Sequence, residues 1–140
     1  MPSRTIIIVI CAAAAVLVGG GVATVVGASD RPGPVMTANG QVLLNRGIHD
    51  AGLGGCSVDK TRSPDAQADA PVTIRNETGV IVATGKLGAG IALRDEGCEF
   101  PIRVEGVPVG SASFTVAIGD GDPTTVSAES LFSEFTLYPH

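Results

Sequence analysis

The chain has 140 residues, a formal net charge of −5 at pH 7, three cysteines and no tryptophan. This length is enough for one membrane segment and one small domain, but not for two domains. The acidic balance and the scattered lysines and arginines exclude a typical nucleic-acid surface, because phosphate binding needs a clustered basic face.

The first element is an uncharged run from Thr5 to Ala28. As a helix, about 24 residues would extend about 36 Å, more than the hydrocarbon thickness of about 30 Å. Arg4 precedes the run, so the positive-inside rule leaves residues 1–4 in the cytoplasm and places residues 29–140 outside. The pattern therefore predicts a transmembrane signal-anchor in the cell membrane.

A cleaved signal peptide is the alternative, because Val26, Gly27 and Ala28 resemble a cleavage site, and the protein would then be secreted. The run exceeds the about 7–15 residues of a usual signal peptide, which favours the anchor. Acylation of Cys11 would need a small preceding residue, whereas Ile10 stands there. Cys11 is therefore interpreted as a small apolar residue of the span.

Residues 29–70 are polar and interrupted by prolines, which predicts an extracytoplasmic linker. Within it, residues 41–44 could form a short strand or a helical turn. Cys56 and Cys98 are the cysteines outside the predicted span, and an oxidising compartment favours a disulfide between them, with Cys56 docking on the following domain. A zinc site is not expected, because only His49 and His140 could join these cysteines as ligands and no CxxC or HxxxH spacing occurs.

Residues 71–140 show period-two alternation between glycine and proline turns. Strands are expected at 72–75, 80–84, 98–105, 113–118 and 134–138, and Ser127 is expected to cap a helical turn over 128–132. Several short strands predict an all-β fold, a small antiparallel β-sandwich of immunoglobulin-like or transthyretin-like type. The expected core is Val72, Ile74, Ile81, Phe100, Ile102, Val104, Phe114, Val116, Ile118, Leu131, Phe135 and Leu137.

A set of apolar, glycine and turn positions runs from the first expected strand to the helical turn: Val72, Ile74, Gly79, Val82, Ala83, Thr84, Gly85, Leu87, Gly88, Gly90, Gly97, Cys98, Phe100, Val107, Pro108, Phe114, Val116, Ser127 and Leu131. In these positions, this half of the chain resembles a domain of short actinobacterial exported or membrane-anchored proteins with no assigned activity. The chain departs from the pattern at Phe114–Thr115, where an aromatic pair is usual, and at Gly119–Asp120, where a basic residue is common. The resemblance implies a secreted β domain.

Two patterns could carry chemistry. Asp120 and Asp122 could offer carboxylates to calcium, but calcium needs about six to eight oxygens and the EF-hand series is absent. His49 and Asp50 with Ser57 or Ser63 could imitate a hydrolase triad, but no G-x-S-x-G motif accompanies them.

Three further features are interpreted as structural. The glycine-rich residues 85–90 lack the ending of a phosphate loop and are interpreted as turns. Asn76 begins a sequon but fits an Asx turn, and Asp95, Glu96 and Glu99 fit a solvated loop.

No catalytic residue, metal ligand or cofactor is therefore predicted. The sequence favours a non-catalytic interaction or envelope-associated module that contacts the membrane and an envelope protein, and not nucleic acid. A small-ligand or ion-binding module is the alternative, and an enzyme is the third class.

Overall fold

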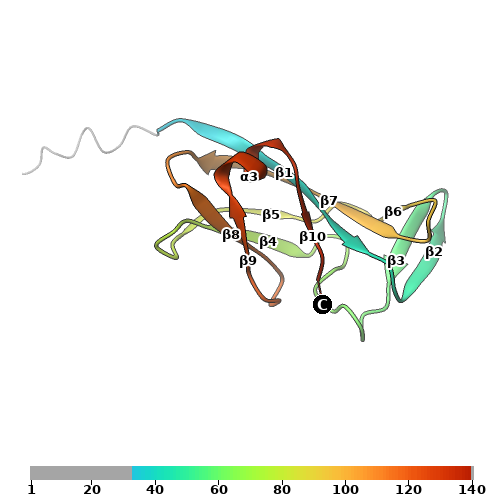
Figure 1. The fold of residues 1–140 in the computed structure, drawn as a ribbon. Coiled ribbons are helices and arrows are strands. Elements are labelled where there is room, and N and C mark those ends of the chain that lie inside the picture. Colours follow the sequence, from blue (N-terminus) through green and yellow to red (C-terminus); the bar gives the residue numbers. More distant parts are fainter. Residues whose placement is uncertain (1–32, 140) are drawn as a thin grey trace, which may run out of the picture. The chain divides into compact units, whose positions relative to one another are not determined.

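Two β-sheets make up the part of the chain that the structure, a computed structural model, describes, residues 33–139 (Figure 1). The first sheet has six strands in the order β10 (Phe135–Leu137), β1 (Val35–Leu44), β7 (Cys98–Pro108), β6 (Ile91–Ala92), β3 (Gly55–Val58) and β2 (Ile48–Gly52). The second has four strands in the order β5 (Ile81–Lys86), β4 (Pro71–Arg75), β8 (Ser113–Ile118) and β9 (Thr124–Ser127). This confirms an all-β domain and is consistent with a β-sandwich.

The pairing is antiparallel except between β1 and β10, which run parallel. A short helix, α3 (Ala128–Ser133), precedes β10, and the Ser127 side chain accepts a hydrogen bond from the Ser130 N–H at its start. The predicted helical cap is confirmed, because the serine oxygen accepts a hydrogen bond from a backbone N–H that has no acceptor within the helix. The predicted strands at 72–75, 80–84, 98–105, 113–118 and 134–138 correspond to β4, β5, β7, β8 and β10, with shifted ends.

The core lies on alternate residues of the long strands, as a half-buried sheet requires. In β7 the buried residues alternate from Cys98 to Val104, and the next buried residue is Val107. The β1–β7 register shifts between Met36 and Ala38, and this irregularity explains the break in alternation. Ile81, which the sequence placed in the core, is instead 52% exposed. The buried apolar set is Ala38, Val42, Leu44, Cys56, Val58, Ala66, Val72, Ile74, Leu87, Cys98, Phe100, Ile102, Val104, Val107, Phe114, Val116, Ala117, Ile118, Val126, Leu131, Phe135 and Leu137.

The prediction of a linker over residues 29–70 is wrong for the residues that the structure describes. Three strands, β1, β2 and β3, lie within it, and β1 runs between β10 and β7 in the first sheet. The polar and glycine residues in the middle of β1 concealed its alternation. Gly40 faces the Phe135 ring, and a Cβ there would lie 2.6 Å from the ring atom Cε1, so this glycine makes room for β10.

Within residues 33–139, none of the helices has the length and apolar character needed to cross a bilayer. The predicted span over residues 5–28, with Cys11, lies outside the described residues, as does His140.

Candidate functional site

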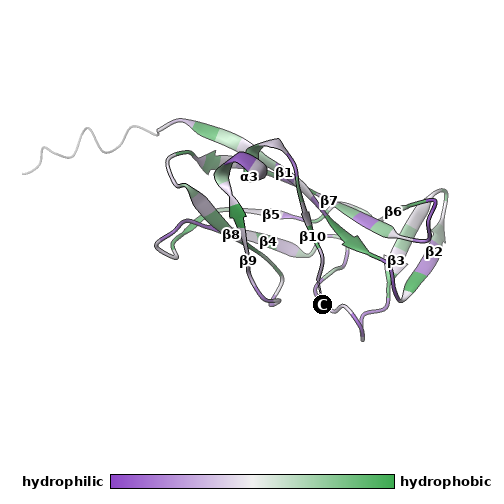
Figure 2. Cartoon of the chain, viewed as in Figure 1, coloured by the Kyte–Doolittle hydropathy of each residue, from purple (hydrophilic) through white to green (hydrophobic). Residues whose placement is uncertain are grey.

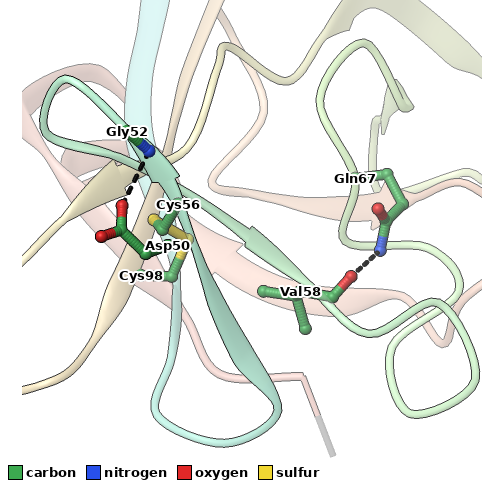
Figure 3. The surroundings of a disulfide bond; sticks show 6 residues. All are labelled: Asp50, Gly52, Cys56, Val58, Gln67 and Cys98. Carbon is green, nitrogen blue, oxygen red and sulfur yellow. Dashed lines mark hydrogen bonds between the residues drawn. A yellow bond between two sulfur atoms is a disulfide. The ribbon is translucent and has the colours of Figure 1, made fainter.

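A disulfide joins Cys56 of β3 to Cys98 at the start of β7, and both side chains are buried (Figure 3). The two Cα atoms are 5.9 Å apart, within the usual range for a disulfide. Only the two-residue strand β6 lies between β3 and β7 in the sheet. The disulfide therefore attaches the β2–β3 hairpin to β7 at the place where the sheet has its shortest strand. The predicted Cys56–Cys98 disulfide is present.

Gly90 lies directly over this bond. Its carbonyl accepts a hydrogen bond of 3.2 Å from the Cys56 N–H, and a Cβ on Gly90 would collide with the Cys56 carbonyl oxygen. The same Cβ would lie 3.0 Å from the Cys98 sulfur. Gly90 is thus required for close approach of the chain to the disulfide, and not for a turn as the sequence reading had it.

Residues 59–70 contain no strand but are fixed by hydrogen bonds, some within the segment and some to neighbouring elements, among them the backbone bond from the Asp69 N–H to the Leu87 carbonyl. The Gln67 amide donates to the Val58 carbonyl at 3.1 Å (Figure 3) and also to the Ser63 carbonyl at 3.0 Å. The Asp59 carboxylate accepts hydrogen bonds from the backbone N–H and the hydroxyl of Thr61 at 2.8 and 2.7 Å. These bonds, the backbone one first, hold the pKa of Asp59 below its ordinary value of 3.8, because they favour the charged form.

Asp120 and Asp122 lie on the turn between β8 and β9, beside residues 62–66 and the end of the described chain. Together these segments line an open hollow of about 410 Å³ that includes the side chains of Arg62, Asp65 and Tyr138. The Asp65 carboxylate accepts a hydrogen bond of 2.9 Å from the Asp120 backbone N–H. Asp65 therefore ties residues 59–70 to the β8–β9 turn, a role that no sequence pattern indicated.

This arrangement does not assemble a metal site. Within residues 33–139, no group of three or more His, Cys, Asp or Glu side chains could hold a metal ion. Asp95 and Glu96 lie in the exposed turn between β6 and β7, which the Leu93 N–H closes by donating to the Gly97 carbonyl at 2.9 Å. The acidic residues at both turns are thus surface residues of hairpin connections.

The imagined hydrolase triad is not brought together. His49 of β2 is paired with Ser57 of β3, but Asp50 follows His49 in the strand, so its side chain lies on the other face of the sheet. The Asp50 carboxylate accepts instead from the Gly52 N–H at 2.7 Å (Figure 3). Ser63 lies outside both strands, on the segment that Gln67 holds.

The glycine-rich residues 85–90 also have a packing role. Gly85 belongs to β5, and a Cβ there would lie 2.8 Å from Cγ2 of Val104 in β7. The absence of a side chain lets β5 approach β7 closely, and Leu87 then bridges to Ile102. The interpretation of all these glycines as turns is therefore corrected.

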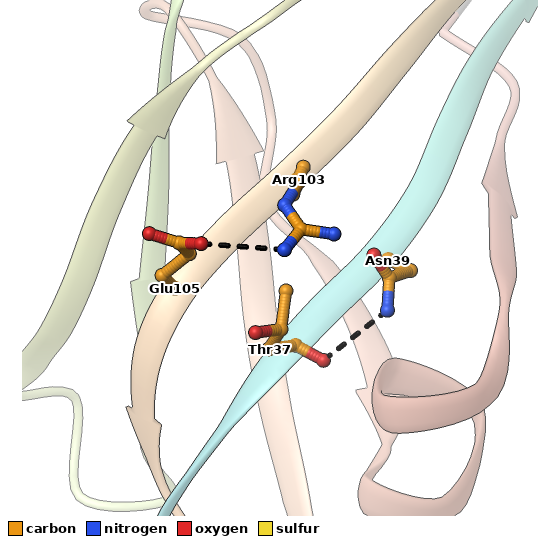
Figure 4. Close-up of polar contacts among 4 residues, drawn as sticks. All are labelled: Thr37, Asn39, Arg103 and Glu105. Carbon is orange, nitrogen blue, oxygen red and sulfur yellow. Dashed lines mark hydrogen bonds and ion pairs between the residues drawn. The ribbon is translucent and has the colours of Figure 1, made fainter.

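The outward face of β1 and β7 is polar. Arg103 and Glu105 form an ion pair of 3.3 Å, and the Asn39 amide donates to the Thr37 carbonyl at 3.4 Å (Figure 4). The ion-pair side chains are 68% and 74% exposed, so the pair adds little to stability. Asn76 behaves as the expected Asx turn, since its side-chain oxygen accepts from the N–H groups of Thr78 and Val80.

Comparison of the chain with protein-family models, with curated proteins and with solved structures found no match. The functional conclusion therefore rests on the residues and the geometry described above.

Proposed function

We propose that this protein is a single-pass membrane protein whose extracytoplasmic β domain serves as a non-catalytic interaction or envelope-associated module. The observation that carries the proposal is the buried Cys56–Cys98 disulfide in the domain that follows the uncharged run over residues 5–28. Stable disulfides belong to oxidising compartments, and a run of this length suits a membrane span. The resemblance to exported or membrane-anchored actinobacterial proteins supports the same assignment.

The domain's surface favours interaction over catalysis. Three carboxylates of the domain hold turns and loops: Asp50, Asp59 and Asp65 each accept hydrogen bonds from backbone N–H groups. We take the partner to be a protein of the envelope, together with the membrane itself, and not nucleic acid or a cofactor. We also infer that the two mostly antiparallel sheets form an immunoglobulin-like or transthyretin-like sandwich.

A protease-protection assay tests the topology. Trypsin added to intact spheroplasts is expected to degrade the domain from outside, because residues 29–140 follow a span preceded by Arg4. Full protection until the membrane is permeabilised would place the domain in the cytoplasm and refute the proposal. Pull-down from detergent-solubilised membranes then searches for the envelope partner.

The alternative function is small-ligand or ion binding, for which the hollow beside Asp65, Asp120 and Tyr138 is the favouring observation. A ligand that binds the folded state raises the melting temperature by mass action. A thermal-shift series with calcium and with cell-wall fragments distinguishes the two functions. A concentration-dependent rise that Asp122→Asn abolishes would favour the binding module.

A further inference from the structure

Exposed apolar side chains gather at one end of the domain. Val35 and Met36 begin β1 and are 54% and 48% exposed, and Val109, just after β7, is 37% exposed. Val35 pairs with Pro108 of β7, and the Val109 N–H donates to the Pro34 carbonyl at 3.2 Å. Figure 2 colours the start of β1 green for hydrophobic residues. The start of β1 and the end of β7 thus form one apolar edge.

The β4–β5 turn adds two more apolar residues to the same end. Val80 and Ile81 are 56% and 52% exposed. One Glu77 carboxylate oxygen accepts from the Ala112 and Ser113 N–H groups at 2.9 and 3.1 Å, which ties this turn to the β7–β8 connection. Figure 1 shows the β4–β5 turn, the β7–β8 connection and the start of β1 at one end of the molecule. We call Val35, Met36, Val80, Ile81 and Val109 the tether-end residues.

The opposite end has a different character. It holds the β6–β7 turn with Asp95 and Glu96, which precedes Cys98 at the far end of β7. In the first sheet the register separates this turn from the apolar edge, because β1 pairs Leu44 with Cys98 at one end and Val35 with Pro108 at the other. In the second sheet the β8–β9 turn, with Asp120 and Asp122, follows Ile118, which pairs with Val72 at the start of β4, whereas the β4–β5 turn follows the other end of β4.

A membrane anchor over residues 5–28 would hold the start of β1 near the bilayer. If residues 5–28 span the bilayer, six residues, 29–34, lie between the span and Val35. Fully extended, six residues reach about 21 Å at about 3.5 Å each. The inference rests on the proposed function at this point, since the bound applies only to an anchored chain.

We propose that the tether-end residues rest on the lipid surface of the membrane that anchors the chain, with their side chains in the interfacial region. Exposure of five apolar side chains to water raises the free energy of the domain. Their transfer to the boundary between headgroups and acyl chains removes this unfavourable term. Two acidic residues are close in the chain to these positions: the Glu77 carboxylate is partly compensated by two backbone N–H groups, and Glu105 pairs with Arg103. The acidic turns at the other end then face away from the headgroups.

Site-directed fluorescence on the full chain in lipid nanodiscs tests this contact. In a Cys11→Ser background, single cysteines at Val80→Cys, Val109→Cys and Leu53→Cys are labelled without reduction, so that the Cys56–Cys98 bond stays closed. Leu53 is the matched control, since it is fully exposed at the tip of the β2–β3 hairpin, toward the Cys98 end of the sheet. Lipids with a nitroxide near the headgroup serve as quenchers.

Labels at Val80 and Val109 are expected to be quenched at least about twofold more strongly than the label at Leu53, as shallow insertion of about 5–10 Å requires. Equal quenching at all three positions would overturn the inference. Protection of Val80 from aqueous iodide without lipid quenching would also overturn it, because another protein surface would then cover this end. Flotation of the same variants with liposomes under alkaline wash reports the anchor separately. Loss of flotation refutes the proposed anchor, whereas flotation with equal quenching refutes only the lipid contact.

Discussion

Acidic side chains that accept hydrogen bonds from backbone N–H groups hold loops of this domain in place. Asp65 binds the β8–β9 turn, and Glu77 binds the β7–β8 connection from a turn 35 residues away in sequence. Backbone donors in a loop lack the partners that strands provide, so each such carboxylate replaces a missing ladder bond. Residues that looked like surface charges in the sequence are therefore fold determinants.

Glu77→Ala is expected to lower the free energy of unfolding by about 1 kcal/mol, because two partly solvated backbone donors lose a charged acceptor. Glu77→Gln keeps an acceptor oxygen and should lose less. Urea denaturation followed by circular dichroism measures the difference. The matched control is Glu105→Ala, which removes an exposed ion pair and should cost under about 0.5 kcal/mol. An equal loss in both alanine variants would contradict the role given to Glu77.

Asp59 is expected to titrate below its ordinary pKa of 3.8 in the folded protein, because Thr61 donates two hydrogen bonds to its charged form. A depressed folded-state pKa means that the contribution of Asp59 to stability is present above the unfolded pKa and is lost as the pH falls through the folded one. Carboxyl chemical shifts between pH 2 and pH 6 measure the pKa. Thr61→Ala should raise the pKa only in part, since the backbone donor remains. A full return to the ordinary value would show that the hydroxyl alone lowers it.

Cys98→Ser and Cys56→Ser should each lower the free energy of unfolding, by at most about 4 kcal/mol for a sequence separation of 42 residues. The double variant should be no less stable than either single variant, since one bond is lost in each case. Denaturant curves in a Cys11→Ser background measure the three values. Two free thiols upon alkylation of the unreduced, denatured protein would rule the bond out.

At the scale of elements, β1 is an interior strand of the first sheet. It pairs with β10 on one side and with β7 on the other, and it buries Ala38, Val42 and Leu44. The β2–β3 hairpin depends on β6 and on the disulfide for its attachment. The segment before Pro71 is thus part of the folding unit.

A chain that begins at Pro71 is expected to lack a cooperative unfolding transition, whereas a chain that begins at Gly33 should retain one. The shorter chain loses the partner of β10, one side of β7 and the partner of Cys98. When a small domain loses an interior strand, the apolar surface that the remaining chain buries cannot offset the conformational entropy that this chain loses on folding. Urea titration monitored by Tyr138 fluorescence and circular dichroism compares the two chains. A sharp transition in the shorter chain would restore the view of residues 29–70 as a linker.

At the scale of the whole molecule, the proposed arrangement joins one span to one domain through a very short connection. The anchor is expected to stay attached, because the uncharged run is longer than a signal peptide's apolar region of about 7–15 residues. Intact mass measurement of the protein from washed membranes should give the uncleaved chain. An abundant soluble form that begins at Ser29 would show cleavage after Ala28 instead.

The sequence by itself determined the local features of this protein. Alternation with period two located β4, β7 and β8, and the serine cap located α3, because these patterns depend on residues near each other in the chain. Counting the cysteines outside the predicted span was enough to identify the disulfide pair.

Only the tertiary structure decided what depends on distant partners. Gly40 and Gly90 look like chain breaks in the sequence, yet they make room for Phe135 and for the disulfide. Ile81 follows the strand pattern but lies at the start of the edge strand β5, where its side chain stays about half exposed. Glu77 and Asp65 gain their roles from N–H groups 35 and 55 residues away, and local sequence carries no record of such separations.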